Sequence, residues 1–254
     1  LNDSRLTYNE SEDIADEFAE RGITYDKNSN ILTLNRSSLS TADARNYRFS
    51  YDGNQRVKET NSNSSYSYDA NGNITSDALR GLEITYNLLN LPSTMYGGGD
   101  YSDYYDYLAD GTKIQHEYSD GQQDRYIGSL VYYSNGEFSA PIGGGRLVSE
   151  GNTTAAHYFL TDHLGSTRVV AKVTSAGCED LDRKDYYPFG KVWQQSGMPA
   201  SGNRYTFSGK EQQRAGLAST KLLDFGARLY DPDGVTFLQQ DPLMEKYSSI
   251  GQYN

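Results

Sequence analysis

The chain contains the segment Tyr66-Ser-Tyr-Asp-Ala-Asn-Gly-Asn-Ile-Thr-Ser76, which has the features of a β-hairpin. Side chains alternate along a strand, so Tyr66 and Tyr68 lie on the same face. Asp69 can accept hydrogen bonds from the backbone amides just ahead of it, and Asn71-Gly72 tolerates the positive φ angles of a tight turn. The segment therefore predicts a strand, a turn, and a second strand that starts near Asn73.

Related segments recur along the first half of the chain. They are Gly22-Ile-Thr-Tyr-Asp-Lys-Asn-Ser-Asn-Ile-Leu-Thr-Leu-Asn-Arg36, Tyr47-Arg-Phe-Ser-Tyr-Asp-Gly-Asn-Gln-Arg-Val-Lys58, Leu82-Glu-Ile-Thr-Tyr-Asn-Leu-Leu-Asn-Leu-Pro92 and Tyr105-Asp-Tyr-Leu-Ala-Asp-Gly-Thr-Lys-Ile-Gln115, the last with Leu108 in place of the Asp. The steps between Tyr25, Tyr51, Tyr68, Tyr86 and Tyr107 are 26, 17, 18 and 21 residues. A lone hairpin is barely stable, so neighbours must stack. We expect an all-β, antiparallel meander of hairpins in a curved or spiralling sheet, with tyrosines paired across strands.

The composition agrees with a tyrosine-rich sheet. Hydrophobic residues make up 36 % of the 254 residues and the mean hydropathy is −0.75, yet there are 23 Tyr against 8 Phe and 1 Trp. Tyrosine has a high strand propensity, and it buries a ring while its hydroxyl keeps a hydrogen-bond partner. Regularly placed aromatic residues argue against disorder. The length allows one large domain or two smaller ones.

The charge and the termini restrict the partners and the compartment. A net charge of −11, a pI near 4.7 and the lack of a basic run disfavour nucleic acid and anionic membranes as partners. The single cysteine, Cys178, cannot form an internal disulfide, and we expect it to be a lone thiol in a loop. The chain shows no signal peptide and no apolar run of the roughly 18 residues that span a bilayer. We expect it to be a piece of a longer polypeptide.

One short helix is predicted before the first repeat. Asn9 and Glu12 have the spacing of a capping box, and Ile14 and Phe18 fall on one helical face. Gly22 is a candidate C-terminal stop for this helix. The helix is expected to be acidic and peripheral.

From about residue 155 the sequence changes to a dense series of distinctive motifs. They are His157-Tyr-Phe-Leu-Thr-Asp-His-Leu-Gly-Ser-Thr-Arg-Val-Val170, Tyr186-Tyr-Pro-Phe-Gly190, Tyr205-Thr-Phe-Ser-Gly-Lys-Glu211, Asp224-Phe-Gly-Ala-Arg-Leu-Tyr-Asp-Pro232 and Phe237-Leu-Gln-Gln-Asp-Pro-Leu243. In wording, order and spacing this series closely resembles the Rhs repeat-associated core domain. The upstream Tyr-Asp segments are similar to the YD repeats of the same superfamily. The resemblance covers the chain from about Gly22 to Asn254.

The resemblance implies an architecture and a division of the chain. The family includes bacterial Rhs and polymorphic toxins, the C component of Tc toxin complexes and the teneurins, in which the repeats spiral into a hollow β-shell and the core domain plugs one end. It implies an N-terminal segment at 1–21, a hairpin-repeat region at 22–155 and a core domain at 156–254, truncated before the cleavage segment. Coiling a strip of hairpins also removes most of its unpaired edges, which makes such a shell physically reasonable.

The resemblance also implies candidate catalytic residues. The core domain of toxin members cuts the chain upstream of the toxin by aspartyl chemistry, and by motif position the matching residues here are Arg228, Asp231 and Asp241. Two close carboxyls can share a proton while an arginine biases their ionisation. The alternative is that both Asp-Pro pairs form turns and that Arg228 is an ion-pair partner. The family's Gly-Arg-aromatic run is altered here to Gly234-Val235-Thr236-Phe237.

Other chemistry-bearing motifs favour structural interpretations. His157 and His163 could share a face of a strand, but no acidic or cysteine ligand set at metal spacing accompanies them or His116, so no metal or cofactor is predicted. Gly165-Ser166-Thr167 lacks the nucleophile-elbow pattern, and Asp162 beside His163 is too local for a hydrolase triad. The runs Gly97-Gly98-Gly99 and Gly143-Gly144-Gly145 are expected to be flexible connectors, since no strand–helix context makes them phosphate loops.

The preferred function is a non-catalytic scaffold of a large secreted or surface protein that houses or presents its own C-terminal toxin. The alternative is an adhesin-like module that binds a surface glycan or protein through exposed tyrosines. No enzyme activity is expected of this piece, although its parent could cleave itself. Neither nucleic acid nor direct membrane insertion is expected, and exposed sheet edges allow a homodimer.

Overall fold

The computed structural model describes residues 3–5, 18–38, 44–59, 65–97, 101–193, 202–213 and 221–246. It is built from strands, with two single-turn 3₁₀ segments and no α-helix in these ranges. None of the described segments is a helix with the length and hydropathy needed to cross a membrane.

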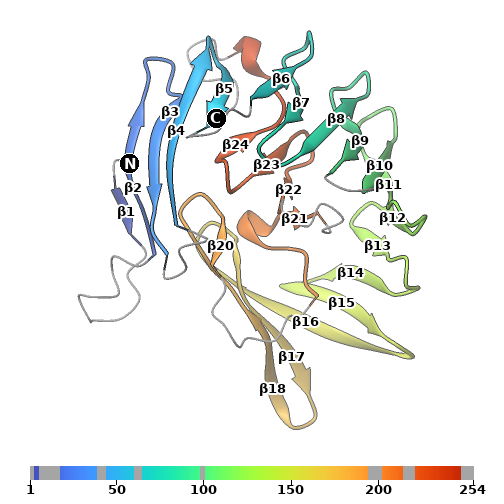
Figure 1. Ribbon diagram of the computed structural model, residues 1–254. Helices are drawn as coiled ribbons and strands as arrows, with labels where there is room; N and C mark the ends of the chain where they lie inside the picture. Colours follow the sequence, from blue (N-terminus) through green and yellow to red (C-terminus); the bar gives the residue numbers. More distant parts are fainter. Residues whose placement is uncertain are drawn as a thin grey trace.

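Two large antiparallel sheets form the wall of the molecule (Figure 1). The first contains β1 (Asp3–Arg5), β2 (Ala19–Tyr25), β3 (Ile31–Arg36), β4 (Arg45–Asp52) and β5 (Gln55–Glu59). The second contains β6 (Tyr66–Tyr68), β7 (Ile74–Asp77), β8 (Leu82–Tyr86), β9 (Pro92–Tyr96), β10 (Ser102–Tyr107), β11 (Lys113–Glu117), β12 (Gln123–Ile127), β13 (Leu130–Tyr132), β14 (Phe138–Ile142), β15 (Gly145–Glu150), β16 (Thr153–Thr161), β17 (Thr167–Thr174) and β18 (Gly177–Arg183). A bridge between Lys58 and Ser65 joins the two sheets. Within each sheet every strand pairs with its neighbour in the sequence, so the predicted all-β meander is confirmed.

The C-terminal segment lies on the concave side of this wall (Figure 1). It contains β21 (Glu211–Gln212), β22 (Leu223–Asp224), β23 (Leu229–Asp231) and β24 (Thr236–Phe237), which form a small sheet, and the 3₁₀ segments η1 (Phe207–Gly209) and η2 (Met244–Lys246). The hairpin of β19 (Asp185–Tyr186) and β20 (Val192–Trp193) precedes it. We call residues 221–246 the plug segment. The division into 1–21, 22–155 and 156–254 stays a prediction, and the second sheet continues from β6 to β18 across residue 155.

One five-residue turn recurs along the described part of the chain. In nine places there, the N–H of the first residue donates to the carbonyl of the fifth, and the carbonyl of the first accepts from the N–H of the fourth. The turns are 26–30, 69–73, 87–91, 108–112, 118–122, 133–137, 162–166, 187–191 and 206–210. The fourth residue always has a positive φ, between 58° and 91° in the nine turns, and it is glycine in seven of them but Ser29 and Asn90 in the other two. Glycine adopts this conformation without steric cost, so the turn explains why glycine recurs at this position.

The predicted function of the turn aspartate is seen directly. Asp69 Oδ1 accepts the amides of Asn71 and Asn73, both at 2.9 Å. Asp162 does the same for Leu164 and Ser166, both at 3.0 Å. The motif around Gly165 is therefore another hairpin turn.

The repeat tyrosines join each hairpin to the preceding one. The hydroxyl of Tyr51 donates to the carbonyl of Ile31 at 2.9 Å, and that of Tyr86 donates to the carbonyl of Ile74 at 2.7 Å. Tyr68 donates to Arg56 at 2.8 Å, and Tyr186, far along the chain, donates to Thr167 at 2.7 Å. These acceptors lie at or near the start of the return strand of an earlier hairpin. The tyrosine before a turn thus links that hairpin to its predecessor.

Turn asparagines make a second link between neighbouring hairpins. Asn71 and Asn73 both donate their side-chain amides to Asn90 Oδ1, at 2.9 Å. Asn28 donates to Asn54 Oδ1 in the same way, at 2.9 Å. The row of turns is therefore tied together by side chains as well as by the sheet ladder.

The apolar core lies between the wall and the plug segment. One cluster packs Leu222, Leu229 and Leu238 of the plug segment against wall residues Tyr66, Ile74, Leu82, Ile84, Met95 and Tyr105. A second cluster packs Val235 against wall residues Ile23, Ile31, Leu34, Tyr47 and Phe49. The plug segment contributes residues to both clusters, so the wall and the plug segment share their apolar core.

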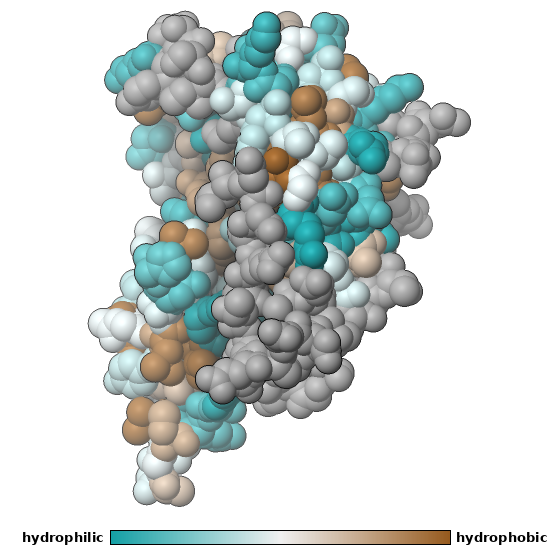
Figure 2. Space-filling model, turned by 90° about the vertical axis from the view of Figure 1, so that its left-hand side faces the viewer, coloured by the Kyte–Doolittle hydropathy of each residue, from teal (hydrophilic) through white to brown (hydrophobic). Residues whose placement is uncertain are grey.

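The outer face is mixed in polarity. Figure 2 shows hydrophilic areas over much of the visible face, with hydrophobic areas near its upper centre and low in the view. Val173, near the turn between β17 and β18, has an exposed fraction of 60 %.

Three local predictions need correction. Most of the predicted helix, including Asn9, Glu12 and Ile14, lies outside the described residues, but Gly22 is in strand β2 and does not end a helix. Gly22 has a φ of 61° where the β2–β3 register shifts, because pairing of β2 with β3 overrides the local helix signals. Cys178 lies in strand β18 and is exposed, so the prediction of a loop was wrong.

The second glycine run is also ordered. Gly143 and Gly144 form a two-residue hairpin loop between β14 and β15, where a flexible connector was predicted. A side chain at Gly145 would approach the carbonyl oxygen of His157 to 2.0 Å, so the close neighbouring strand requires glycine there. In the first run, residues 98–99 lie outside the described ranges.

We predict that Gly72→Val lowers the free energy of unfolding by more than about 1 kcal/mol, because valine resists positive φ. Gly72 has a φ of 79°, and an added Cβ would also meet the side chain of Gln240. The matched control is Gly121→Val, at the same turn position with φ 78° but with open space around it. Urea melts should show a smaller loss for the control. Equal stability of Gly72→Val and the wild type would contradict the proposed turn.

We predict that Tyr86→Phe lowers the free energy of unfolding by about 0.5–1.5 kcal/mol, because it removes the hydrogen bond to the carbonyl of Ile74. Tyr104→Phe is the control, since Tyr104 is on the outer face with an exposed fraction of 43 %. Both are measured by urea denaturation. Equal effects of the two substitutions would show that the hydroxyl of Tyr86 does not link the hairpins.

Candidate functional site

The turn Asp231-Pro232-Asp233-Gly234 joins β23 to β24 and is held by arginines from three successive hairpins of the wall. Arg36 Nη1 lies 2.9 Å from Asp233 Oδ1. Arg56 Nη1 donates to the carbonyl of Gly234 at 2.6 Å, and Arg80 Nη2 lies 3.0 Å from Asp231 Oδ2. We call this turn the plug turn. Three cations of the wall converge on four residues of the plug segment.

Acids of the wall complete the network around these arginines. The fully buried Arg36 donates through Nε to the fully buried Glu20 at 2.7 Å. Arg80 Nη1 lies 2.8 Å from Asp77 and 3.4 Å from Glu59. Buried charges are tolerated when they are paired and hydrogen-bonded in this way. The network therefore depends on both the wall and the plug turn being in place.

The two carboxyls of the plug turn have different electrostatic environments. Burial raises the pKa of Asp231, an effect that Arg80 opposes. Burial also disfavours the charged form of Asp233, but Lys191 and Arg36 outweigh it and lower its pKa to about 2. Lys191 Nζ lies 2.8 Å from Asp233 Oδ1. Neighbouring cations thus keep Asp233 ionised, while Asp231 holds its proton more tightly than usual.

The structure brings together only part of the predicted catalytic set. Arg228 Nη2 lies 3.1 Å from Asp241 Oδ2, and its guanidinium carbon lies 3.8 Å from the centre of the Phe237 ring. Asp231 is bound to Arg80 instead, and the acids that help to raise its pKa are Asp233 and Asp77. The contacts of Arg228 therefore agree with the alternative prediction, in which it is an ion-pair partner. Catalysis by these residues stays a prediction.

Sequence reasoning missed the three arginines of the site and the turn acid Asp233. It also missed their further partners, Glu20, Glu59, Asp77 and Lys191. One signal was available for Arg36 and Arg56, since each occupies an inward-facing position of a strand, where a charged residue needs a partner. Arg80 follows β7 in a turn, where no pattern distinguishes it from a surface residue. The partners of these arginines in the plug turn lie some 150 residues or more away along the chain, for example Arg56 and Gly234 at a separation of 178 residues.

The altered motif at residues 234–237 places strain in the plug turn. Val235 has a φ of 54°, which a β-branched residue rarely adopts. In the Gly-Arg-aromatic pattern, counted back from Phe237, the glycine would fall at this position. The Val235 side chain is buried and packs in the second core cluster. Packing of its side chain offsets the unfavourable backbone conformation.

The histidines do not form a common site. His157 Nε2 lies 3.0 Å from Glu150 Oε1, and His163 is in the exposed part of the turn at 162–166. His116 is buried, with its ring stacked on Tyr105 at 4.3 Å. In the described ranges, no three His, Cys, Asp or Glu side chains are grouped to hold a metal ion.

Comparisons with known proteins show which solved structures have a similar fold. No family model matches the chain. Three solved structures of TcdB2-TccC3 superpose on 93 % of the chain with TM-scores of 0.70–0.73 and 17–18 % sequence identity. The Tc holotoxin pore of Photorhabdus luminescens superposes with a TM-score of 0.68. The chain has a Tc toxin-related, Rhs-type shell fold.

The chain spans a small part of the length of the similar proteins named here. It covers 12–13 % of the TcdB2-TccC3 chains. Salivary gland surface protein 1 of Aedes aegypti is 38 % identical over 98 residues, which is 37 % of this chain and 3 % of that protein. The proteins named here are therefore much longer than this chain.

We predict that the Asp233 carboxylate makes the fold sensitive to acid. Its pKa is lowered to about 2 from 3.8 by Lys191 and Arg36, so its stabilising contribution is present above pH 3.8 and is lost as the pH falls toward 2. Asp233→Asn should be less stable than the wild type at pH 7, and the difference should shrink as the pH falls toward 2. Thermal unfolding of both proteins from pH 7 to pH 2 measures this. A constant difference across that range would rule out the assigned charge pairing.

Proposed function

We propose that this chain is a wall-and-plug segment of a β-shell that encloses a C-terminal part of its parent polypeptide. The observation that carries the proposal is the plug turn, which Arg36, Arg56 and Arg80 of three successive hairpins hold against the concave face of the wall. A free-standing sheet has no need for such a contact. A wall that encloses a cargo needs a fixed closure at its end.

The comparisons support this proposal at the level of the fold. One of the superposed crystal structures is of TcdB2-TccC3 without its hypervariable C-terminal region. By analogy, the enclosed cargo of the parent is a variable C-terminal region, and we propose a toxin or another effector. We further propose that the parent is secreted or lies at the cell surface.

The chain itself is proposed to be non-catalytic. Asp231 acts in this proposal as a structural ligand of Arg80, and Asp241 as a ligand of Arg228. Self-cleavage of the parent by these acids is a separate proposal. It predicts that Asp231→Asn in the parent leaves the polypeptide uncut.

The closure is tested with Arg80→Met in the parent polypeptide. This change leaves the buried carboxyls of Glu59, Asp77 and Asp231 without their shared cation, and it should lower the free energy of unfolding by about 3–5 kcal/mol. Limited proteolysis followed by mass spectrometry should show the region after Asn254 protected in the wild type and cut much faster in the variant.

Arg125→Met is the matched control, since Arg125 is exposed on the wall at β12 and should leave protection unchanged. Lys191→Met, which removes only one ligand of Asp233, provides a milder variant if Arg80→Met does not fold. A region after Asn254 that is cut equally fast in the folded and the denatured wild-type parent would refute enclosure.

A further inference from the structure

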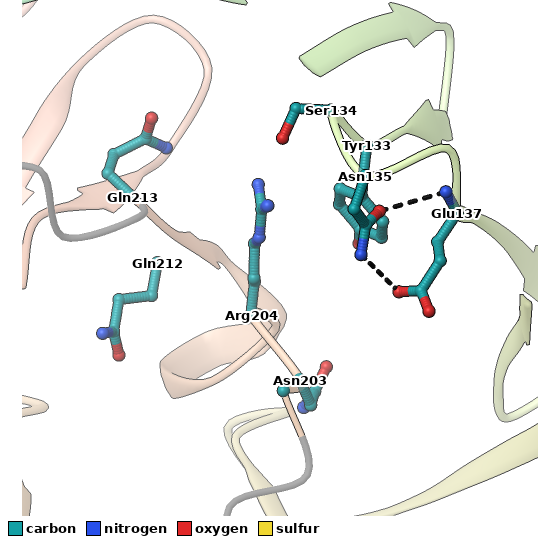
Figure 3. A pocket seen from close by; sticks show the side chains of 9 residues that line it. Tyr133, Ser134, Asn135, Glu137, Asn203, Arg204, Gln212 and Gln213 are labelled. Carbon is teal, nitrogen blue, oxygen red and sulfur yellow. Dashed lines mark hydrogen bonds between the residues drawn. The ribbon is translucent and has the colours of Figure 1, made fainter. Parts of the chain in front are cut away.

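A polar cavity of about 370 Å³ lies between the wall and the segment that leads to the small C-terminal sheet. On the wall side it is lined by the turn between β13 and β14, and on the other side by residues around β21 (Figure 3). The lining residues are Tyr133, Ser134, Asn135, Glu137, Gly202, Asn203, Arg204, Gln212 and Gln213. This volume is within the range of about 300–1,000 Å³ that is usual for small-molecule sites.

Gln213 supplies a buried donor without a partner at this cavity. Its exposed fraction is 7 %, and its side-chain nitrogen Nε2 has no hydrogen-bond partner in the part of the chain that the structure describes. Figure 3 shows the side chain of Gln213 directed toward Arg204 and the turn that carries Ser134. Buried polar groups are nearly always hydrogen-bonded, because an unpaired one is costly. An acceptor atom of a bound molecule would satisfy this amide.

The charges around the cavity favour a neutral ligand. Arg204 Nη1 lies 2.6 Å from Asp124 and 3.6 Å from Glu211, so acids already compensate its charge. Its guanidinium also stacks on the Tyr133 ring, at 4.4 Å from the ring centre. Glu137 adds a negative charge to the lining. An anionic ligand would therefore meet acids as well as the one arginine.

Side-chain amides and one hydroxyl make up most of the remaining lining, at Ser134, Asn135, Asn203, Gln212 and Gln213. The Ser134 hydroxyl already donates to Gln122 at 2.8 Å, and the Asn203 amide donates to the carbonyl of Tyr205 and accepts from its N–H. The amides of Gln212 and Gln213 are therefore the ones that can both donate to a ligand and accept from it. Asn135 is held in place, since it donates to Glu137 Oε2 at 2.9 Å and accepts from the Glu137 amide at 3.0 Å. Amides with both functions match the hydroxyl groups of a sugar, each of which also donates and accepts. The Tyr133 ring supplies an apolar wall.

Main-chain recognition of an added peptide strand has less support. The N–H of Gln212 is bonded to the carbonyl of Arg204 at 2.7 Å, and the N–H of Gln213 to that of Leu222 at 2.9 Å. These two amides are therefore not free to pair with an added strand. The cavity presents side chains, which suits a compact ligand.

We propose that this cavity binds one neutral sugar unit, with Gln213 Nε2 donating to a hydroxyl oxygen. The site is independent of the proposed enclosure, and the exposed tyrosines of the outer face are not among its lining residues. The sugar bridges the wall at the β13–β14 turn and the segment at β21. Binding therefore stabilises their contact.

The test is saturation-transfer NMR of this chain with methyl glucoside, methyl galactoside, methyl mannoside and N-acetylglucosamine, each at about 20 mM. At least one of these should bind, and Gln213→Leu should weaken its binding by tenfold or more. Because the variant removes an unpaired buried amide, its melting temperature should equal or exceed that of the wild type. Gln123→Leu, on the wall strand β12 and outside the cavity, should bind as the wild type does.

Two further ligands, glucuronate and a short Gly-Ser-Asn-Gly peptide, test the ligand class. Binding of glucuronate or the peptide alone would overturn the assignment of a neutral sugar. So would the absence of any saccharide binding, or equal binding by Gln213→Leu and the wild type. If Gln213→Leu does not fold, Gln212→Leu replaces it, because Gln212 lines the same cavity and is only half-buried.

Discussion

The hydrogen bond from a tyrosine hydroxyl to a carbonyl of the preceding hairpin is the interaction on which the wall depends. A hairpin alone is barely stable, and strand pairing does not by itself fix how consecutive hairpins stack. Tyr51, Tyr68 and Tyr86 set this stacking, because each ring packs inward while its hydroxyl reaches a defined backbone atom. Phenylalanine could fill the same volume without setting the register. This explains a composition with 23 Tyr and 8 Phe.

Such a wall has a concave face, and the charges on that face determine what closes it. Buried ion pairs add little net stability, since desolvation offsets much of their attraction, but an unpaired buried charge is very unfavourable. Arg80, shared by Glu59, Asp77 and Asp231, therefore specifies the position of the plug turn more than it stabilises the fold. Leucines of the plug segment supply the apolar part of the contact.

Local signals predicted the parts of the structure that local interactions form. The Asp69 turn, the strand alternation at Tyr66 and Tyr68, and the meander were predictable because each depends on residues a few positions apart. The prediction that Gly22 ends a helix was wrong, because strand β3 supplies a pairing partner for β2 that no local pattern reveals. The prediction of the site was incomplete for the same reason. The arginines and the plug turn are far apart in the sequence and meet only in the curved wall.

The difference between hydrogen bonds to backbone atoms and pairs of side chains also explains how a fold is shared at low sequence identity. The turn bonds and the tyrosine bonds end on backbone atoms, which every residue carries, so the residues around them can change freely. A TM-score of 0.73 at 18 % identity is the expected result. Side-chain pairs such as Arg36 with Asp233 require two matching residues, so we expect the two to change together. If the proposed enclosure holds, differences in what such walls enclose should be found on the concave face, among paired charges, while the turns stay the same.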